Sequence, residues 1–118
     1  MIMAQLSLKK ALAKTFSALN PVAINTMTYN QCTTGSYTRC YKVGKIVLLS
    51  FNINITTATT SYDYITGIPP ALGGGWACCG VITGGQPIRF WVTTTGTLRT
   101  DGTAYAGWVN GSVVYICQ

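Results

Sequence analysis

The residue types that most often carry catalysis are scarce in this chain. It has no histidine, and Asp63 and Asp101 are its acidic residues. Histidine is the commonest general base, and a glycosidase needs a pair of carboxylates. A cysteine nucleophile would lack a histidine to activate it. We therefore expect no enzymatic activity and no catalytic residue.

The spacing of the five cysteines does not favour a metal site. They are Cys32, Cys40, Cys78, Cys79 and Cys117, with no CxxC pair among them. Adjacent cysteines are poor zinc ligands. Gly73–Gly75 also lacks the lysine and hydroxyl of a phosphate-binding loop. The sequence therefore predicts no metal and no cofactor.

The chain is rich instead in aromatic side chains with a polar end, which suit subunit interfaces and sugar-stacking surfaces. They are Tyr29, Tyr37, Tyr62, Tyr64, Trp76, Trp91, Tyr105 and Trp108. Turn-forming residues crowd around Tyr62, Asp63, Tyr64 and Trp76, and recognition usually sits on loops carried by a rigid scaffold. We predict that these four residues face a receptor.

A long strand within Tyr41–Thr57 is the element that must carry such loops. From Val47 to Ile55 the odd positions are apolar, and the even positions are polar after Leu48. Because side chains alternate across a strand, one face of this strand must enter a core. Pro87–Thr95 shows the same alternation, and Leu98–Thr100 is predicted to pair back on it.

Two hairpins are predicted from turn residues. Asn110–Gly111 is the strongest short turn signal, and we expect it to join two strands, 104–109 and 112–117. A turn near Gly35–Ser36 would place Cys32 opposite Cys40. A disulfide there would need oxidising conditions; in a reducing cytoplasm we expect the cysteines to be small buried hydrophobic residues.

Residues 21–118 are therefore predicted to be one mainly β head domain, an antiparallel β-sandwich or jelly-roll of about seven short strands. Residues 1–20 are predicted to be a helical segment, with Leu8, Leu12, Phe16 and Leu19 at helical spacing. Asn20–Pro21 ends this segment. Such a short helix is marginal in water, so it must pack on its own sheet, on its copies or on a larger assembly.

The composition favours association between subunits. Of the 118 residues, 48% are hydrophobic and 8% charged, against about 25% charged residues in an average protein. A bare surface of this kind invites contact, so we expect an obligate oligomer.

The net charge of +6 does not form a basic stripe with interleaved aromatic residues. Three of the eight basic residues are Lys9, Lys10 and Lys14, and the others are scattered. We expect no nucleic-acid binding, although a basic nucleic-acid-binding β-barrel stays open as a third interpretation. We also expect no membrane insertion, because no apolar run has the length of a membrane span. We expect no secretion signal, because the N-terminal apolar stretch is interrupted by Lys9, Lys10 and Lys14 and no clear cleavage site follows it.

The order of motifs from Tyr41 onward resembles the C-terminal head modules of bacteriophage tail-fibre and receptor-binding proteins. The matching pieces are YKVGKIVLLSFNINI, ITGIPP, RFWVTTTGTLRT and GWVNGSVVYICQ. The resemblance implies a small β-sandwich that forms a homotrimer, projects from a virion assembled in the bacterial host cytoplasm and meets a host-surface glycan or protein.

The resemblance also gives residues 1–20 a role. Leu8, Leu12, Phe16 and Leu19 would be the contacts that anchor the head to other virion proteins or hold the trimer together. Two alternatives stay open: a capsid head-fibre or decoration protein, and a carbohydrate-binding module of a cellular protein.

Overall fold

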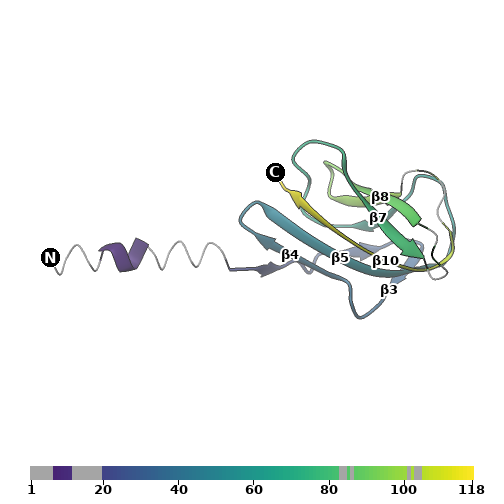
Figure 1. The fold of residues 1–118 in the computed structure, drawn as a ribbon, viewed down its shortest axis with the longest axis horizontal. Coiled ribbons are helices and arrows are strands. Elements are labelled where there is room, and N and C mark those ends of the chain that lie inside the picture. The colour runs from purple at the N-terminus through teal and green to yellow at the C-terminus, as the bar shows by residue number, and fades with distance from the viewer. Residues whose placement is uncertain (1–6, 12–19, 83–84, 86, 101, 103–104) are drawn as a thin grey trace.

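The chain is mainly β, as predicted (Figure 1). A computed structural model describes residues 7–11, 20–82, 85, 87–100, 102 and 105–118. The strands are β1 (Val22–Ala23), β2 (Thr28–Tyr29), β3 (Cys32–Thr34), β4 (Arg39–Val43), β5 (Ile46–Ile55), β6 (Asp63–Thr66), β7 (Trp76–Ile82), β8 (Pro87–Val92), β9 (Thr97–Thr100) and β10 (Gly107–Ile116). All of their pairings are antiparallel.

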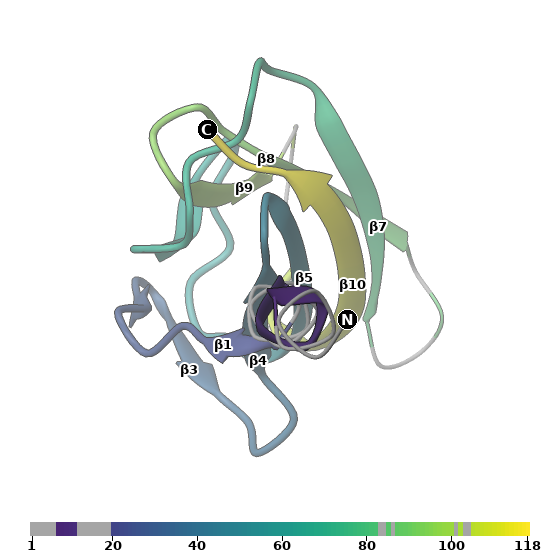
Figure 2. The same cartoon turned by 90° about the vertical axis from the view of Figure 1, so that its left-hand side faces the viewer.

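The strands form one curled sheet, a half-barrel, instead of the predicted β-sandwich or jelly-roll. The order is β1-β4-β5-β10-β7-β8-β9-β6-β2, and β3 also pairs with β5. The end-on view shows the strands winding around the core (Figure 2). The segment Thr28–Thr34 bridges the two sides of the curl, because β2 pairs with β6 and β3 pairs with β5. These pairings occupy backbone hydrogen-bonding groups at the edges of β5 and β6, which would otherwise be free to pair with other chains.

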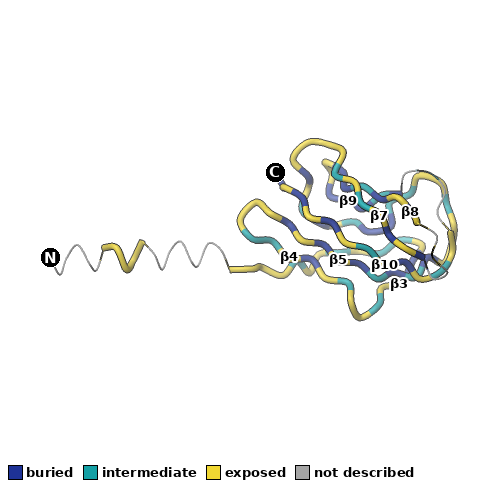
Figure 3. Tube along the Cα trace, viewed as in Figure 1, coloured by how far each residue is buried: buried dark blue, intermediate teal, exposed yellow. Residues whose placement is uncertain are grey.

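β5 and β10 are the longest pair of strands in the sheet. They are paired over ten residues, from Ile46 opposite Ile116 to Ile55 opposite Gly107. The odd residues of β5 are buried, and Ile46, Leu48 and Ser50 are exposed (Figure 3). The alternation read from the sequence is therefore confirmed, and it sets which residues of both strands face outward.

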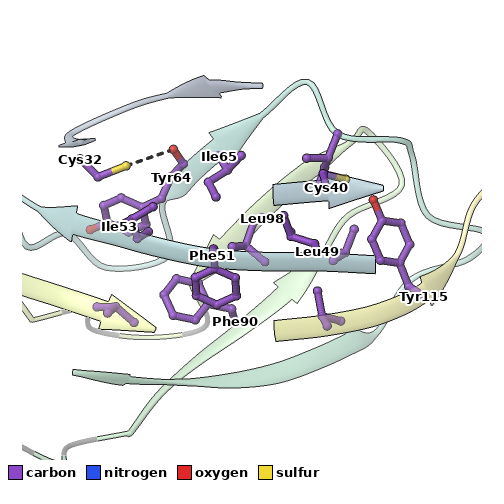
Figure 4. Packing of buried hydrophobic residues seen from close by; sticks show 14 of the residues in the cluster. Cys32, Cys40, Leu49, Phe51, Ile53, Tyr64, Ile65, Phe90, Leu98 and Tyr115 are labelled. Atoms are coloured by element: carbon purple, nitrogen blue, oxygen red, sulfur yellow. Dashed lines mark hydrogen bonds between the residues drawn. The ribbon is translucent and has the colours of Figure 1, made fainter. Parts of the chain in front are cut away.

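The predicted hairpin at Asn110–Gly111 is wrong, because both residues lie inside β10. Gly111 is opposite Phe51, and a Cβ at Gly111 would lie 2.4 Å from Cζ of that ring. Gly80, the partner of Gly111 on β7, has the same role: a Cβ there would lie 2.9 Å from Cε2 of Phe90. The two rings meet edge to face, with centroids 5.1 Å apart (Figure 4). Both glycines therefore make room for aromatic rings.

The predicted hairpin between Cys32 and Cys40 is also wrong. β3 and β4 pair one after the other along the same side of β5, so Cys32 is opposite Ile55 and Cys40 is opposite Leu49. All five cysteines are free thiols. Cys32, Cys40 and Cys117 are buried, as expected of small hydrophobic residues, whereas Cys79 is exposed.

The structure describes only part of the predicted N-terminal helix. Residues 7–11 are helical, and Leu8 is 60% exposed. Leu12, Phe16 and Leu19 lie outside the described residues. Within the part of the chain that the structure describes, no helix has the length and hydrophobicity needed to cross a membrane.

Candidate binding surfaces

Tyr64, one of the four predicted receptor-facing residues, is completely buried, so that prediction is wrong for this residue. Its hydroxyl donates to the carbonyl of Thr57 (3.1 Å) and accepts from the amide N–H of Thr59 (3.2 Å). Its carbonyl accepts from the amide N–H of Asn30 (2.9 Å) and from the thiol of Cys32 (3.5 Å; Figure 4). Tyr64 therefore fixes the loop after β5 to the segment that bridges the curl.

Tyr62 and Trp76 are only partly exposed, and both pack against the core. The ring of Tyr62 meets that of Tyr64 edge to face, with centroids 5.1 Å apart. The indole Nε1 of Trp76 donates to the carbonyl of Leu72 (3.1 Å). Trp76 is opposite the buried Val92 on β8, so it belongs to the inward-facing register. Neither side chain is presented as a free platform.

Asp63 lies on the outer side of the curl, where it forms an ion pair. Its Oδ1 is 2.9 Å from Nη1 of Arg99, and the two side chains are 39% and 33% exposed, respectively. The hydroxyl of Thr97 donates to the same oxygen (3.4 Å). Trp91 is the next residue in this cross-strand row. The four predicted residues therefore do not converge on one site, because Asp63 faces outward and the other three are turned toward the core.

A second outer surface was missed in the prediction from sequence. We call it the uncharged face, and it consists of the outward residues of β5 and β10. These are Ile46, Leu48, Ser50, Asn52, Asn54, Trp108, Asn110, Ser112, Val114 and Ile116. The signal was present in the alternation of each strand, because the outward positions of both lack any Lys, Arg, Asp or Glu.

The apolar half of the uncharged face lies at the end of the sheet nearer β1 (Figure 1). It consists of Ile46, Leu48, Val114 and Ile116, all exposed, with Val114 at 59%. Tyr41 on β4 continues it, because Tyr41, Leu48 and Val114 form one cross-strand row. An open groove of about 650 Å³ crosses this half, with Tyr37 and Arg39 among the residues that line it. Water-soluble monomers rarely expose a continuous apolar patch of this kind.

The amide half of the uncharged face lies at the opposite end of the sheet. It consists of Asn52, Asn54, Asn110 and Trp108. Nδ2 of Asn52 donates to Oδ1 of Asn110 (2.5 Å), and Asn54 is opposite Trp108. Trp108 is 40% exposed. This half offers amide hydrogen-bonding groups beside an aromatic ring, and it carries no charge.

Three of the thiols, those of Cys32, Cys40 and Cys78, are not activated as nucleophiles. Burial raises the pKa of Cys40 to about 11, and it does the same for Cys32 against the smaller opposing effect of a backbone hydrogen bond. The pKa of Cys78 is raised to about 11, first by burial and then by the neighbouring Cys79. These three thiols are therefore protonated at neutral pH. The described residues contain no group of three or more His, Cys, Asp or Glu side chains that could hold a metal ion.

No family model and no curated protein matches this chain. A solved structure does resemble it: the receptor binding protein (gp15) of Listeria phage PSA, with a TM-score of 0.63 and 16% sequence identity. The match covers 98% of this chain and 78% of that chain. At this level of identity the likeness shows the fold. The fold of this chain is therefore similar to that of a phage receptor-binding protein, in agreement with the resemblance read from the motifs.

Proposed function

We propose that this chain is a non-enzymatic structural protein of a bacteriophage virion, the head of a fibre or tail tip that binds the host surface. The observation that carries the proposal is the fold likeness to a phage receptor binding protein over nearly the whole chain. The scarcity of catalytic residue types in the sequence agrees with a binding role.

The proposal includes a homotrimer held together through the apolar half of the uncharged face. A net charge of +6 opposes association between copies, so a contact between them is favoured on a part of the surface with few charged side chains. The outward residues of β5 and β10 carry no charge, Arg39 on β4 is the charged residue at the border of the groove, and the side chains of the apolar half would gain free energy from burial. Residues 1–20 would anchor the trimer to other virion proteins through Leu8, Leu12, Phe16 and Leu19.

Immunogold labelling of intact phage particles tests the location that we propose. An antibody against the β domain should label the tip of the tail. Label over the capsid would favour a decoration protein instead, and particles without any label would refute a virion role.

A further inference from the structure

We infer that the amide half of the uncharged face binds an uncharged pyranose sugar, with Trp108 as the stacking surface and Asn54 as the principal hydrogen-bonding group. The inference rests on the proposed function and specifies the class of receptor. The amide half lies at the end of the sheet away from β1, which is the end that would point away from a particle anchored through residues 1–20 (Figure 1).

The backbone at Trp108 is held in the sheet, and its side chain is still accessible. It lies in β10 with β5 alongside it, and 40% of its surface is exposed. An indole ring on a sheet presents a flat apolar surface to the C–H groups of a sugar ring. Because the strand is already ordered, little conformational entropy is lost on binding.

Asn54 supplies hydrogen-bonding groups beside this ring. It is the cross-strand partner of Trp108 on one side and of Thr33 on the other. Among the described residues, its side-chain amide has no hydrogen-bond partner. An amide presents a carbonyl acceptor and an NH₂ donor, and this pair matches hydroxyl groups that both donate and accept.

The neighbouring cross-strand row carries a pair of amide side chains, Asn52 and Asn110. Nδ2 of Asn52 donates to Oδ1 of Asn110, which leaves the NH₂ group of Asn110 to face a ligand. Asn52 is held in place by the segment after β3: a Cβ at Gly35 would lie 1.8 Å from Oδ1 of Asn52. Glycine at position 35 therefore lets the backbone close over this amide, and the two amides are fixed before any ligand arrives.

The absence of charge argues for an uncharged ligand. The chain has eight basic residues and two acidic ones, yet none lies among the ten outward residues of β5 and β10. The outward residues that flank the amide half, Thr33 on β3 and Val81 on β7, are also uncharged; the outward Arg39 on β4 is opposite Ser50, outside the amide half. An anionic polymer would be met by lysine or arginine. Trp91 is a weaker candidate for stacking against a sugar. The charged side chains in its cross-strand row, Asp63 and Arg99, form an ion pair with each other and are therefore less available to a ligand.

A printed array of neutral and anionic glycans, probed with the full chain, tests the inference. The wild-type protein should bind neutral glycans, with little change in binding as the salt concentration rises. Trp108→Ala should weaken this binding roughly 30-fold or more, as expected for a central aromatic anchor. Asn54→Ala should weaken it about fivefold. Trp91→Ala is the matched control, because it removes a partly exposed indole from β8, and it should bind like the wild type.

Each of the other outcomes would overturn the inference. One such outcome is that the wild-type protein prefers anionic glycans and loses this binding at high salt. Another is that it binds no neutral glycan, and a third is that Trp108→Ala and the wild type bind equally well. A change in the solution mass of Trp108→Ala would instead assign this half of the face to a contact between copies. Circular dichroism must first show that the variants are folded. None of these results would move the immunogold label, so failure of the sugar site and failure of the virion role are distinguishable.

Discussion

At the scale of single residues, Gly111 shows how a local sequence signal can mislead. The Asn-Gly dipeptide is typical of a turn, yet the ring of Phe51 occupies the space where a side chain at Gly111 would lie. A sequence cannot reveal this use of glycine, because the ring that needs the space lies 60 residues away in the chain. The same reasoning applies to Gly80, which lies beneath Phe90.

We expect Gly111→Ala to lower the free energy of unfolding by about 1–3 kcal/mol, because the new methyl group would overlap the ring of Phe51. Urea denaturation measures the change. The control is Gly74→Ala, since a Cβ at Gly74 has no atom within 4 Å; its effect should be within about 0.5 kcal/mol. Equal effects of the two substitutions would contradict the role that we assign to Gly111.

The buried thiols predict a loss of stability at alkaline pH. Burial raises the pKa of Cys40 from its ordinary value of 9.0 to about 11, and that of Cys32 likewise. The unfolded chain therefore loses these protons at a lower pH than the folded chain. The stabilisation is complete below about pH 9 and is lost as the pH rises toward 11.

A Cys32→Ala/Cys40→Ala double variant isolates this effect, because lysines and tyrosines also titrate in the alkaline range. The variant should be less stable at pH 7, since two core side chains are shortened. Its stability should then fall less steeply than that of the wild type between pH 9 and pH 11 in urea denaturation. Parallel curves for the two proteins would show that the thiols do not contribute.

At the scale of elements, strand periodicity predicted more than turn residues did. The alternation of β5 gave the correct buried face, and that of β8 placed Ile88, Phe90 and Val92 in the core. The single curled sheet could not be predicted in the same way. It depends on β3 and β4 pairing in succession along one long strand, which no local pattern specifies.

Thr38 hydrogen-bonds to Asn52, the residue of β5 that lies between the parts paired with β3 and with β4. Its hydroxyl accepts from the amide N–H of Asn52 (2.9 Å) and donates to the carbonyl of the same residue (3.0 Å). A side chain thus takes the place of a missing strand partner. We expect Thr38→Ala to lower the free energy of unfolding by about 1–2 kcal/mol.

Hydrogen exchange at the amide of Asn52 provides the direct measurement, and it should become faster in Thr38→Ala. Thr94→Ala, in the exposed turn between β8 and β9, is the control and should leave both exchange and stability unchanged. Unaltered protection of Asn52 in the Thr38 variant would contradict this account.

At the scale of the whole molecule, the sequence predicted the fold class better than the site. Low charge and the order of motifs pointed to an associating β protein with a phage-like fold. The receptor-facing set was chosen from turn residues near aromatic side chains, and Tyr64 is instead buried as a support for two loops. The sequence alone cannot show that Tyr64 is buried, because a β-bulge between Asp63 and Ile65 interrupts the alternation of inward and outward residues. The burial becomes clear only when the pairing of β6 with its neighbouring strands is known.

The proposed trimer predicts a solution mass of three times 12.6 kDa by light scattering. Leu48→Glu should give a folded monomer, because it adds like charges to the apolar half of each copy. Thr94→Glu adds the same charge at an exposed turn and should remain trimeric. Removal of residues 1–20 separates the two associating elements: a trimer that survives places the contact in the sheet. A full-length monomer would contradict the proposed assembly.

Inhibition of phage adsorption tests the central claim, host-surface binding, most directly. Host cells are incubated with the purified full-length protein and then exposed to the bacteriophage to whose virion we propose that it belongs. We predict that the protein occupies the receptor and slows adsorption in a dose-dependent way, and that Leu48→Glu, which lacks the avidity of a trimer, does so less effectively. Unchanged adsorption at a large excess of wild-type protein would contradict the claim.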